Sequence, residues 1–292
     1  MKGNNDKSVF IILVNYNGMK HTVECIESIK KIDYPNYKVI VVDNDSNEAI
    51  DCLKQEYSEV EVIRSNTNLG FAGGNNLGIK SALENEADYI LLLNNDTTVE
   101  ADFLDILINR MELYGADVVC PRIVNYFNRE IIMYAGGDIS KFKGGVTIYD
   151  NIQKHDRRIT FVHGCCMLLK SDVFKNVGLL PEEYFLYYED TAYSAKLQQH
   201  GCTVYYIEDA IIYHKESVST HKGSDDFQYY FIRNRLTFIK QYIKMPIKLA
   251  AYFYTGLFIL KGFIQGGFDG HNCKQAIGDF ARCRLGKRRQ VK

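Results

Sequence analysis

The sequence predicts an α/β protein in which helices flank a mostly parallel sheet, and three observations support this fold class. Short apolar runs recur through the first hundred residues, uninterrupted at 9–14 and 89–93 and with one charged residue each at 38–42 and 60–63. Runs of this kind are typical of strands that are buried on both faces of a parallel sheet. Segments with helical character separate the runs, and a polar cluster follows each run. Strands that alternate with helices in this way form a doubly wound sheet.

The first half of the chain alternates strand and helix in order. Apolar residues three apart predict a helix over 21–31, and a second helix is expected over 48–57. A glycine-rich loop, 66–76, opens a third helix that runs to about residue 83. Because ligands bind at the carboxyl ends of strands in open α/β sheets, the polar clusters predict a cleft along one edge of the sheet. Each cluster taken alone also fits a turn or a helix cap.

The second half has a mixed pattern. Two glycine pairs, Gly136-Gly137 and Gly144-Gly145, flank short strand-like pieces and predict an antiparallel hairpin. Further apolar and capping patterns predict a buried strand, a short helix ending at Gly178, a longer helix and a last strand. These four elements are expected at 161–169, 173–177, 191–200 and 204–213.

Composition limits the class of protein. A chain of 292 residues fits one large α/β domain, or a domain with an appendage. The net charge of −1 gives no general attraction for nucleic acid. The eight cysteines form no CxxC pair, which argues against a zinc or redox motif and favours reduced thiols in the cytoplasm. The polar N-terminus does not resemble a signal peptide, and the longest charge-free apolar run, 249–260, is shorter than the roughly 20 residues of a spanning helix.

The strand at 89–93 ends in Asn94-Asn95-Asp96, which is the first candidate ligand site. A carboxylate flanked by amide oxygens suits a hard divalent cation that keeps some coordination positions for substrate phosphates. The same triplet could instead be a polar turn. No GxGxxG motif follows the first strand and no GxxxxGK[ST] motif occurs, so a dinucleotide fingerprint and a P-loop are both unsupported.

Two further candidates lie near the end of the expected sheet. Glu189 and Asp190 precede the helix at 191–200, where negative charge is favoured, and they follow the aromatic run YFLYY, which is expected to be a strand. The pair could be a solvated helix cap, but the aromatic run favours a cleft. His214 follows the last strand and becomes a candidate ligand if a metal binds nearby.

Over about residues 8–240 the sequence resembles the family 2 glycosyltransferases, which are inverting enzymes with a GT-A fold. The resemblance rests on the order and spacing of several short motifs, each of them weak alone. They are VNYNG, VVDNDS, NLGFAGGNN, LLLNND, the block from HGCCMLLKSDVF to YFLYYEDTAYSAKLQQHG, and YHKESVST. Within the family the chain looks most similar to bacterial rhamnosyltransferases and related enzymes of cell-surface polysaccharide synthesis.

The resemblance implies roles for individual residues. Asn15, Tyr16 and Asp43 match positions that hold the nucleotide base and ribose. The loop that closes the nucleotide pocket matches Asn68, Gly70, Phe71 and Asn75. The triplet Asn94-Asn95-Asp96 matches the metal- and diphosphate-binding DxD motif, and His214 matches a position near the metal. Asp190 matches the catalytic base, with Glu189 beside it.

The triplet departs from the family pattern because its first position is Asn94. With one carboxylate fewer, Asp96 becomes the main anionic ligand for Mg²⁺ or Mn²⁺. The implied chemistry needs two things, neutralisation of a leaving diphosphate and a carboxylate base for the acceptor hydroxyl. A single in-line attack inverts the anomeric centre and requires no covalent nucleophile.

After about residue 240 the chain changes character, so the sequence predicts a glycosyltransferase domain over 1–240 and a helical tail over 241–292. From Lys244 to the end there are ten Lys or Arg and two Asp, a charge of +8. An apolar helix with basic flanks suits an anionic membrane surface, whereas the alternative is a helix packed on the domain with a solvated basic end. The expected location is therefore the cytoplasm or the inner face of the cell membrane.

The function expected from the resemblance is transfer of a sugar from a dTDP- or UDP-linked donor to a glycan or lipid-linked acceptor, with rhamnose from dTDP-rhamnose favoured. A UDP-hexose- or galactofuranose-dependent transferase of the same fold is the alternative. A nucleotidyltransferase would need a glycine-rich, arginine-containing loop after the first strand, which NYNGMK lacks. A non-catalytic binding module is disfavoured because Asp96 and Asp190 are both present.

Overall fold

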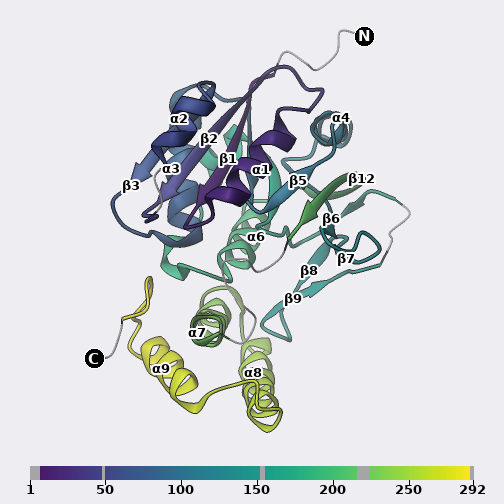
Figure 1. Ribbon diagram of the computed structural model, residues 1–292. Helices are drawn as coiled ribbons and strands as arrows, with labels where there is room; N and C mark the ends of the chain where they lie inside the picture. Colours follow the sequence, from purple (N-terminus) through teal and green to yellow (C-terminus); the bar gives the residue numbers. More distant parts are fainter. Residues whose placement is uncertain (1–6, 48–49, 152–154, 216–223, 290–292) are drawn as a thin grey trace.

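The computed structural model describes residues 7–47, 50–151, 155–215 and 224–289. Figure 1 shows a large α/β body that carries the N-terminus, with three helices, α7, α8 and α9, set against one end of it. Most of the buried apolar side chains of the body form one cluster around the central strands.

The body is built on a ten-stranded sheet with the main order β10-β12-β6-β11-β4-β1-β2-β3. β4, β1, β2 and β3 pair in parallel, as the sequence predicts, and β12 is parallel to β6. β11 runs antiparallel to both β4 and β6, so the sheet is mixed at this point. The strand bounds are β1 Val9–Asn15, β2 Tyr37–Asn44, β3 Val60–Ser65, β4 Tyr89–Leu93, β5 Thr97–Val99, β6 Val118–Asn125, β7 Ile132–Tyr134, β8 Gly137–Ser140, β9 Gly145–Ile148, β10 Arg157–Arg158, β11 Cys166–Lys170 and β12 Val204–His214.

Helices cover the sheet and extend beyond it. α3 packs on β1 and β2, and α4 packs on β12 and β6. The helix bounds are α1 Met19–Ile29, α2 Asp51–Glu56, α3 Gly70–Glu84, α4 Phe103–Tyr114, α5 Ser171–Val177, the 3₁₀ turn η2 Glu182–Tyr184, α6 Glu189–Gln199, α7 Asp225–Tyr242, α8 Ile247–Ile264 and α9 Gly270–Ala281. The separate hairpin predicted from the glycine pairs is confirmed as β8 and β9, which pair antiparallel.

Three sequence-based assignments are wrong in detail. The glycine-rich stretch is not a loop that precedes α3, because the helix already begins at Gly70. Its glycines let α3 approach the sheet: a Cβ at Gly78 would lie 2.5 Å from the Cγ2 of Ile12. The strand expected over 161–169 is limited to β11, and the aromatic run YFLYY forms η2 and a turn in place of a strand.

The C-terminal helices form a small layer of their own. α7 packs against both α8 and α9, and α7 begins at a cap in which the Ser224 hydroxyl accepts a hydrogen bond from the Phe227 backbone N–H at 3.2 Å. α8 has 18 residues with Lys248 and Lys261 near its ends, so by length and composition alone it could cross a membrane. The charge-free run of twelve residues is therefore shorter than the apolar helix that contains it. The domain division at residue 240 stays a prediction.

Candidate active site

A hydrogen-bonded cluster of side chains ties together the carboxyl ends of β1, β2 and β4. The Asn15 amide donates to the Ser46 hydroxyl at 3.1 Å, and its carbonyl oxygen accepts from the Thr22 hydroxyl at 3.0 Å. The Asn95 amide donates to the Thr22 hydroxyl at 2.9 Å. Asn95 therefore points toward the end of β1 and is occupied by structural contacts. Thr22 and Ser46 were missed in the sequence, where nothing but their nearness to polar clusters marked them.

Asp43 is fully buried at the end of β2 and keeps one unsatisfied oxygen. Its Oδ1 accepts from the Ser46 backbone N–H at 3.3 Å, whereas its Oδ2 has no hydrogen-bond partner and lies 3.5 Å from the Arg64 Nε. A buried carboxylate with a free lone pair can accept hydrogen bonds from a ligand that enters the cleft. Tyr16, in contrast, is 44% exposed at the rim.

The glycine-rich start of α3 is held against β2 and against the turn after η2. The Asn44 side chain contacts Asn68, the Leu69 backbone N–H and the Gly70 carbonyl. Gly70 has a φ of +73°, and a Cβ there would lie 2.2 Å from the Phe185 carbonyl oxygen, so only glycine is accommodated.

The next positions of α3 continue this contact. The Phe71 backbone N–H donates to the Phe185 carbonyl at 2.8 Å, so the start of α3 is bonded directly to the turn. Asn75 is buried and bonds back to the Phe71 carbonyl within the helix.

The carboxylate of Asp96 and the imidazole of His214 lie together, as expected from their positions at the ends of two strands. The His214 Nε2 lies 3.1 Å from the Asp96 Oδ1, and both side chains are about nine-tenths buried. Burial by itself would raise the pKa of Asp96, but the hydrogen bond and charge of His214 outweigh it, and the pKa of Asp96 is lowered. Asn94 is held by its backbone N–H, which donates to the Cys165 carbonyl at 2.8 Å.

A buried lysine follows directly after His214. The Lys215 backbone N–H donates to the Asp96 carbonyl at 3.1 Å, and its ammonium group donates to Glu24 at 2.5 Å and lies 3.2 Å from the His21 Nδ1. The hydrogen bond from Lys215 is the main reason that the pKa of Glu24 is lowered. The backbone of Lys215 is thus bonded to Asp96 while its ammonium group is held by Glu24, and the sequence offered only the adjacency of Lys215 to His214.

Glu189 and Asp190 occupy the first turn of α6 and differ in environment. The Asp190 Oδ2 accepts from the Gly164 backbone N–H at 3.2 Å, and its Oδ1 accepts from the Thr191 backbone N–H at 2.6 Å. Glu189 is buried and its Oε2 has no hydrogen-bond partner. Burial, followed by the charge of Asp190, raises the pKa of Glu189 to about 8.

Gly164 lies between Asp190 and the start of α3. A Cβ at Gly164 would lie 3.3 Å from the Phe71 ring and 3.4 Å from the Asp190 Cβ, so the three residues meet at one point. The next residue, Cys165, accepts the hydrogen bond from Asn94. The segment 164–165 thus connects the carboxylate of Asp190 to the triplet at the end of β4.

The turn before Asp190 has an unusual backbone. Phe185, Tyr187 and Tyr188 all have positive φ, from 65° to 72°, which is rare for non-glycine residues and is often found at functional sites. Two buried side chains of α7 stabilise this turn. The Asn234 amide donates to the carbonyls of Tyr184, Leu186 and Tyr187 at 2.7–2.8 Å, and the Arg233 Nη2 donates to the Tyr184 carbonyl at 2.9 Å. No role for Arg233 or Asn234 could be expected from the sequence, because neither residue belongs to a motif.

The residues present fit a divalent cation that is shared with a substrate. Asp96 and His214 supply an oxygen and a nitrogen at one point, and Mg²⁺ or Mn²⁺ commonly takes one or two protein ligands together with substrate phosphates. Within the part of the chain that the structure describes, no group of three His, Cys, Asp or Glu side chains could enclose a metal without such help.

Two named relatives are similar over most of the chain. The low-salt glycan biosynthesis hexosyltransferase Agl10 of Haloferax volcanii is 25% identical over 234 residues, covering 77% of this chain and 73% of that protein. The dTDP-rhamnosyl transferase RfbF of Shigella flexneri is 22% identical over 209 residues, covering 72% of this chain and 69% of that protein.

A solved structure and a family model complete the comparison. The crystal structure of GalNAc-T7 with UDP, GalNAc and Mn²⁺ is 16% identical, covers 80% of this chain and 48% of that chain, and superposes with a TM-score of 0.66, which confirms the GT-A fold. The model of Glycosyl transferase family 2 matches residues 10–178, more than half of the chain, and this segment contains the triplet and the glycine-rich stretch. The protein is therefore a glycosyltransferase, and it belongs to glycosyl transferase family 2.

Proposed function

We propose that this glycosyltransferase transfers a sugar, with inversion at its anomeric carbon, from a nucleoside diphosphate donor to a glycan or lipid-linked acceptor of cell-surface polysaccharide synthesis. The observation that carries the proposal is the position of Asp190. Its carboxylate is held by two backbone N–H groups and lies beside Gly164 and Phe71 at the start of α3. A carboxylate that is fixed in position is what a general base requires.

The donor nucleotide lies, in this proposal, along the ends of β1 and β2 and the start of α3. The free oxygen of Asp43 accepts a hydrogen bond from the base or ribose, and Tyr16 covers the base at the rim. Asn68 and Gly70 shape the wall of the pocket, and the Asn15 cluster holds the strand ends in place. The GalNAc-T7 structure, which contains UDP, supports a nucleoside diphosphate donor, whereas its place on this chain is argued from the residues above.

Asp96 and His214 are the residues that would hold Mg²⁺ or Mn²⁺. The cation supplies Lewis-acid neutralisation of the leaving diphosphate. The Mn²⁺ in the GalNAc-T7 structure supports the use of a divalent cation. Asn94 and Asn95 contribute to the shape of the strand end, and Asp96 is the one anionic side chain of the triplet.

Asp190 acts on the acceptor. Its carboxylate takes the proton from the acceptor hydroxyl as that oxygen attacks the anomeric carbon and the diphosphate leaves. Glu189 lies behind it, buried and neutral at neutral pH because burial raises its pKa to about 8, and it orients the start of α6. The Gly164 and Thr191 N–H groups keep the base in one rotamer.

The donor favoured here is dTDP-rhamnose, because RfbF is named as a dTDP-rhamnosyl transferase. The hexosyltransferase name of Agl10 supports the alternative, a UDP-hexose or a related donor. A thermal-shift screen with dTDP-, UDP- and GDP-sugars and Mg²⁺ or Mn²⁺ separates them, because a ligand that binds the native state raises Tm by mass action. A shift with UDP-glucose and none with dTDP-rhamnose would select the alternative.

The tail is proposed to bring the enzyme to the inner face of the cell membrane, where a lipid-linked acceptor is present. Its support is the exposed apolar side of α8 followed by basic residues. Removal of the tail from Pro246 is a poor test, because α9 covers the buried Tyr229 and Tyr230 of α7. Point substitutions on α8 leave that packing in place.

Asp190→Asn tests the reaction itself. The amide keeps the size of the side chain but takes no proton, so kcat falls by roughly 10²- to 10⁴-fold while the Kd of the donor changes little. Glu189→Gln is the matched control, at the neighbouring position of the same helix turn, and retains turnover. Normal turnover of Asp190→Asn together with loss in Glu189→Gln would transfer the role of base to Glu189, and full turnover of both would remove the pair from the mechanism.

A further inference from the structure

The tip of the β8–β9 hairpin carries an exposed aromatic side chain between two lysines. Phe142 is 59% exposed, and Lys141 and Lys143 on either side of it are exposed as well. Exposure of a Phe side chain to water is unfavourable. The catalytic body thus presents its own apolar and basic tip, separate in sequence from the C-terminal tail.

This tip lies against α8. The Phe142 ring packs edge-on to the Tyr254 ring, with centroids 6.1 Å apart. Gly144 contacts α7 and α8 so closely that a Cβ there would lie 2.5 Å from the Cδ1 of Ile239 and 3.6 Å from the Cβ of Ala251. Figure 1 shows the hairpin reaching from the sheet toward α7 and α8.

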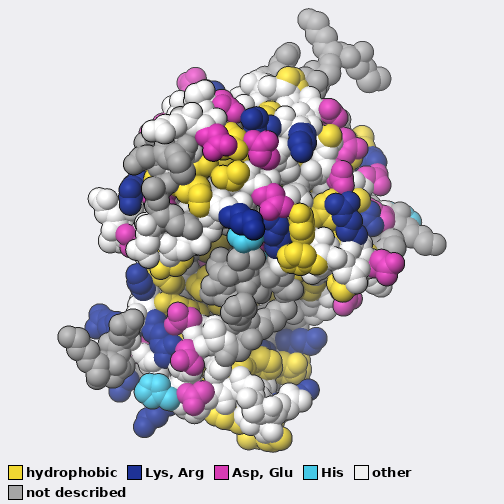
Figure 2. Space-filling view, viewed as in Figure 1, with side chains coloured by type: hydrophobic (Ala, Val, Ile, Leu, Met, Phe, Trp, Pro, Cys, Tyr) yellow, Lys and Arg dark blue, Asp and Glu magenta, His cyan; other side chains and the backbone are white. Residues whose placement is uncertain are grey.

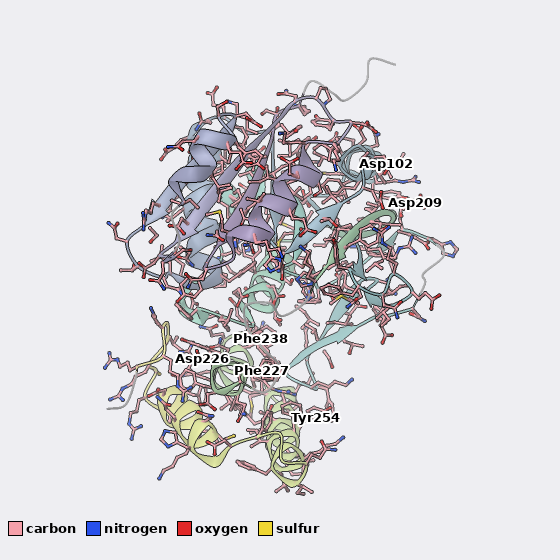
Figure 3. The ribbon with its side chains drawn as sticks, viewed as in Figure 1. Asp102, Asp209, Asp226, Phe227, Phe238 and Tyr254 are labelled. Atoms are coloured by element: carbon pink, nitrogen blue, oxygen red, sulfur yellow. The ribbon has the colours of Figure 1, made fainter. Side chains whose placement is uncertain are left out.

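Arg235 fixes the hairpin and α8 in one arrangement. This α7 side chain is buried, donates to the Lys143 carbonyl, and donates to the Thr255 hydroxyl at 3.1 Å. Its guanidinium group also lies over the rings of Tyr254 and Phe258, at 5.5 Å and 4.6 Å from their centroids. Figure 3 shows Tyr254 on α8 and Phe227 and Phe238 on the adjacent α7.

The opposite side of α8 is apolar and open. Only 11% of this helix is buried in the structure, although its mean hydropathy is high enough for a membrane segment. Large side chains are exposed along it, and Figure 2 shows hydrophobic side chains gathered on this end of the molecule. They are Leu249, Phe253, Leu257, Leu260 and Ile264. A continuous exposed patch of this kind marks an interaction site.

The charges around this patch identify the partner. The segment 244–268 contains Lys244, Lys248 and Lys261 and no acidic residue, and the hairpin segment 139–148 contains two lysines and no acidic residue. An apolar patch fringed by lysines complements an anionic lipid bilayer, whose headgroups attract the ammonium groups while the apolar side chains enter the acyl boundary.

The packing favours a helix that lies in the bilayer surface over one that spans it. Ala251 and Thr255 are fully buried against α7. If α8 spanned a bilayer, the hairpin tip beside Tyr254 would enter hydrocarbon together with the exposed ammonium groups of Lys141 and Lys143, which is costly. We propose that the β8–β9 tip and the outer side of α8 form a single surface that binds an anionic bilayer, with Phe142 and Phe253 at the depth of the headgroup–acyl boundary.

This surface goes beyond the proposed membrane role of the tail, because it includes the catalytic body and is joined to the candidate base. The Tyr188 hydroxyl donates to the Gly144 carbonyl at 3.2 Å, and Tyr188 directly precedes Glu189 and Asp190. Binding through this surface would hold Asp190 at a fixed height above the bilayer, where the hydroxyl of a lipid-linked acceptor would reach it. This consequence for the reaction rests on the proposed function.

The chain has no tryptophan, so single-tryptophan variants report on one position each. The test uses the full chain and vesicles of anionic phospholipid at low salt, with brominated lipids as quenchers. Phe142→Trp and Phe253→Trp are expected to shift to the blue and to be quenched most by bromine near the headgroups. Phe127→Trp is the matched control, because Phe127 is 76% exposed in the loop between β6 and β7, and it is expected to stay unquenched.

Each other outcome overturns the proposal. Quenching of Phe253→Trp without Phe142→Trp would restrict the contact to α8, and quenching of Phe253→Trp chiefly by bromine at the bilayer centre would mean that α8 spans. Absence of quenching at both would exclude the bilayer as partner. These readouts need no sugar transfer, so they succeed or fail separately from the proposed reaction.

The lysines of the tip give a second measurement. The double variant Lys141→Gln and Lys143→Gln is expected to bind anionic vesicles about 30-fold less tightly, from the usual contribution of one basic residue near such a surface. The control, Lys31→Gln with Lys80→Gln, removes the same charge from exposed positions in the α/β body and should bind as the unmodified chain does. An equal loss of vesicle affinity in both double variants would mean that only the net charge matters. That result would refute a binding surface that includes the hairpin tip.

Discussion

Glu189→Gln should gain stability relative to the unmodified chain as the pH rises through a defined window. Glu189 is buried with an unsatisfied carboxylate oxygen, and burial, followed by the charge of Asp190, raises its pKa from 4.5 to about 8. In the unfolded chain the group regains its ordinary pKa. Between pH 4.5 and 8 the native state therefore binds a proton that the unfolded state has released. The free energy of unfolding accordingly falls as the pH rises through this window.

The size of the effect follows from the shift. Each pH unit inside the window lowers the free energy of unfolding by up to about 1.4 kcal/mol, which amounts to at most about 3 kcal/mol at pH 7. The Gln variant does not titrate, so it escapes this loss and keeps only a pH-independent cost of its buried amide, about 1–3 kcal/mol. At roughly 2–4 °C per kcal/mol, the difference in Tm between the two proteins should change by several degrees between pH 5 and pH 8.

The assay is thermal unfolding of both proteins, followed by circular dichroism in matched buffers from pH 4.5 to pH 8.5. The Tm of the Gln variant should rise relative to that of the unmodified chain as the pH increases, and the difference should level off above about pH 8. Glu183→Gln, on the nearby η2 turn, is the control for the loss of a carboxylate and should give a flat difference. A Tm difference for Glu189→Gln that is constant across the range would mean that this carboxylate titrates normally in the native state.

Two further predictions concern residues around the base and the metal. Asp96→Ala should abolish transfer, because Asp96 provides the only carboxylate of the triplet. His214→Ala should have a milder effect and weaken donor binding. Full turnover of the unmodified enzyme in excess chelator would refute the metal role. Asn234→Ala removes three hydrogen bonds to the turn before Asp190 and should lower kcat by more than it changes the donor Kd, with Tm measured alongside. A loss of Tm with unchanged kcat at low temperature would limit Asn234 to a structural role.

The sequence was sufficient where one local pattern determines the structure. β1, β2 and β4 follow from their continuous apolar runs, and the polar residues after them meet at one edge because parallel strands end there. The pairing of Asp96 with His214 could be expected from the family resemblance, although the residues are more than a hundred positions apart. Their actual contact depends on β12 pairing with β5, which no local pattern specifies.

The sequence was insufficient where tertiary contacts override local preference. The run from Tyr184 to Tyr188 has the composition of a strand, but α7 holds it as a turn with three positive φ angles. Cys166–Lys170 could be recognised as a strand, but its antiparallel direction follows from the route of the chain and not from its residues. The glycine-rich stretch was interpreted as a loop because glycine disfavours helix, whereas close packing on Ile12 requires glycine inside α3.

α7 connects the proposed reaction centre and the proposed bilayer surface through adjacent residues. Asn234 bonds the turn that precedes Asp190, and Arg235 bonds the hairpin carbonyl and the buried Thr255 of α8. Neighbouring positions on a helix point about 100° apart, so one helix can face the reaction centre with one side chain and the proposed bilayer surface with the next. Any movement of α8 relative to the body must first break the contacts of Arg235. The tail therefore cannot bind a membrane independently of the body. Arg235→Lys keeps the charge but loses the planar fork that bonds two elements at once. We therefore expect Arg235→Lys to retain activity on a soluble acceptor and to lose activity on a vesicle-bound acceptor, and equal activity on both would mean that the two surfaces act independently.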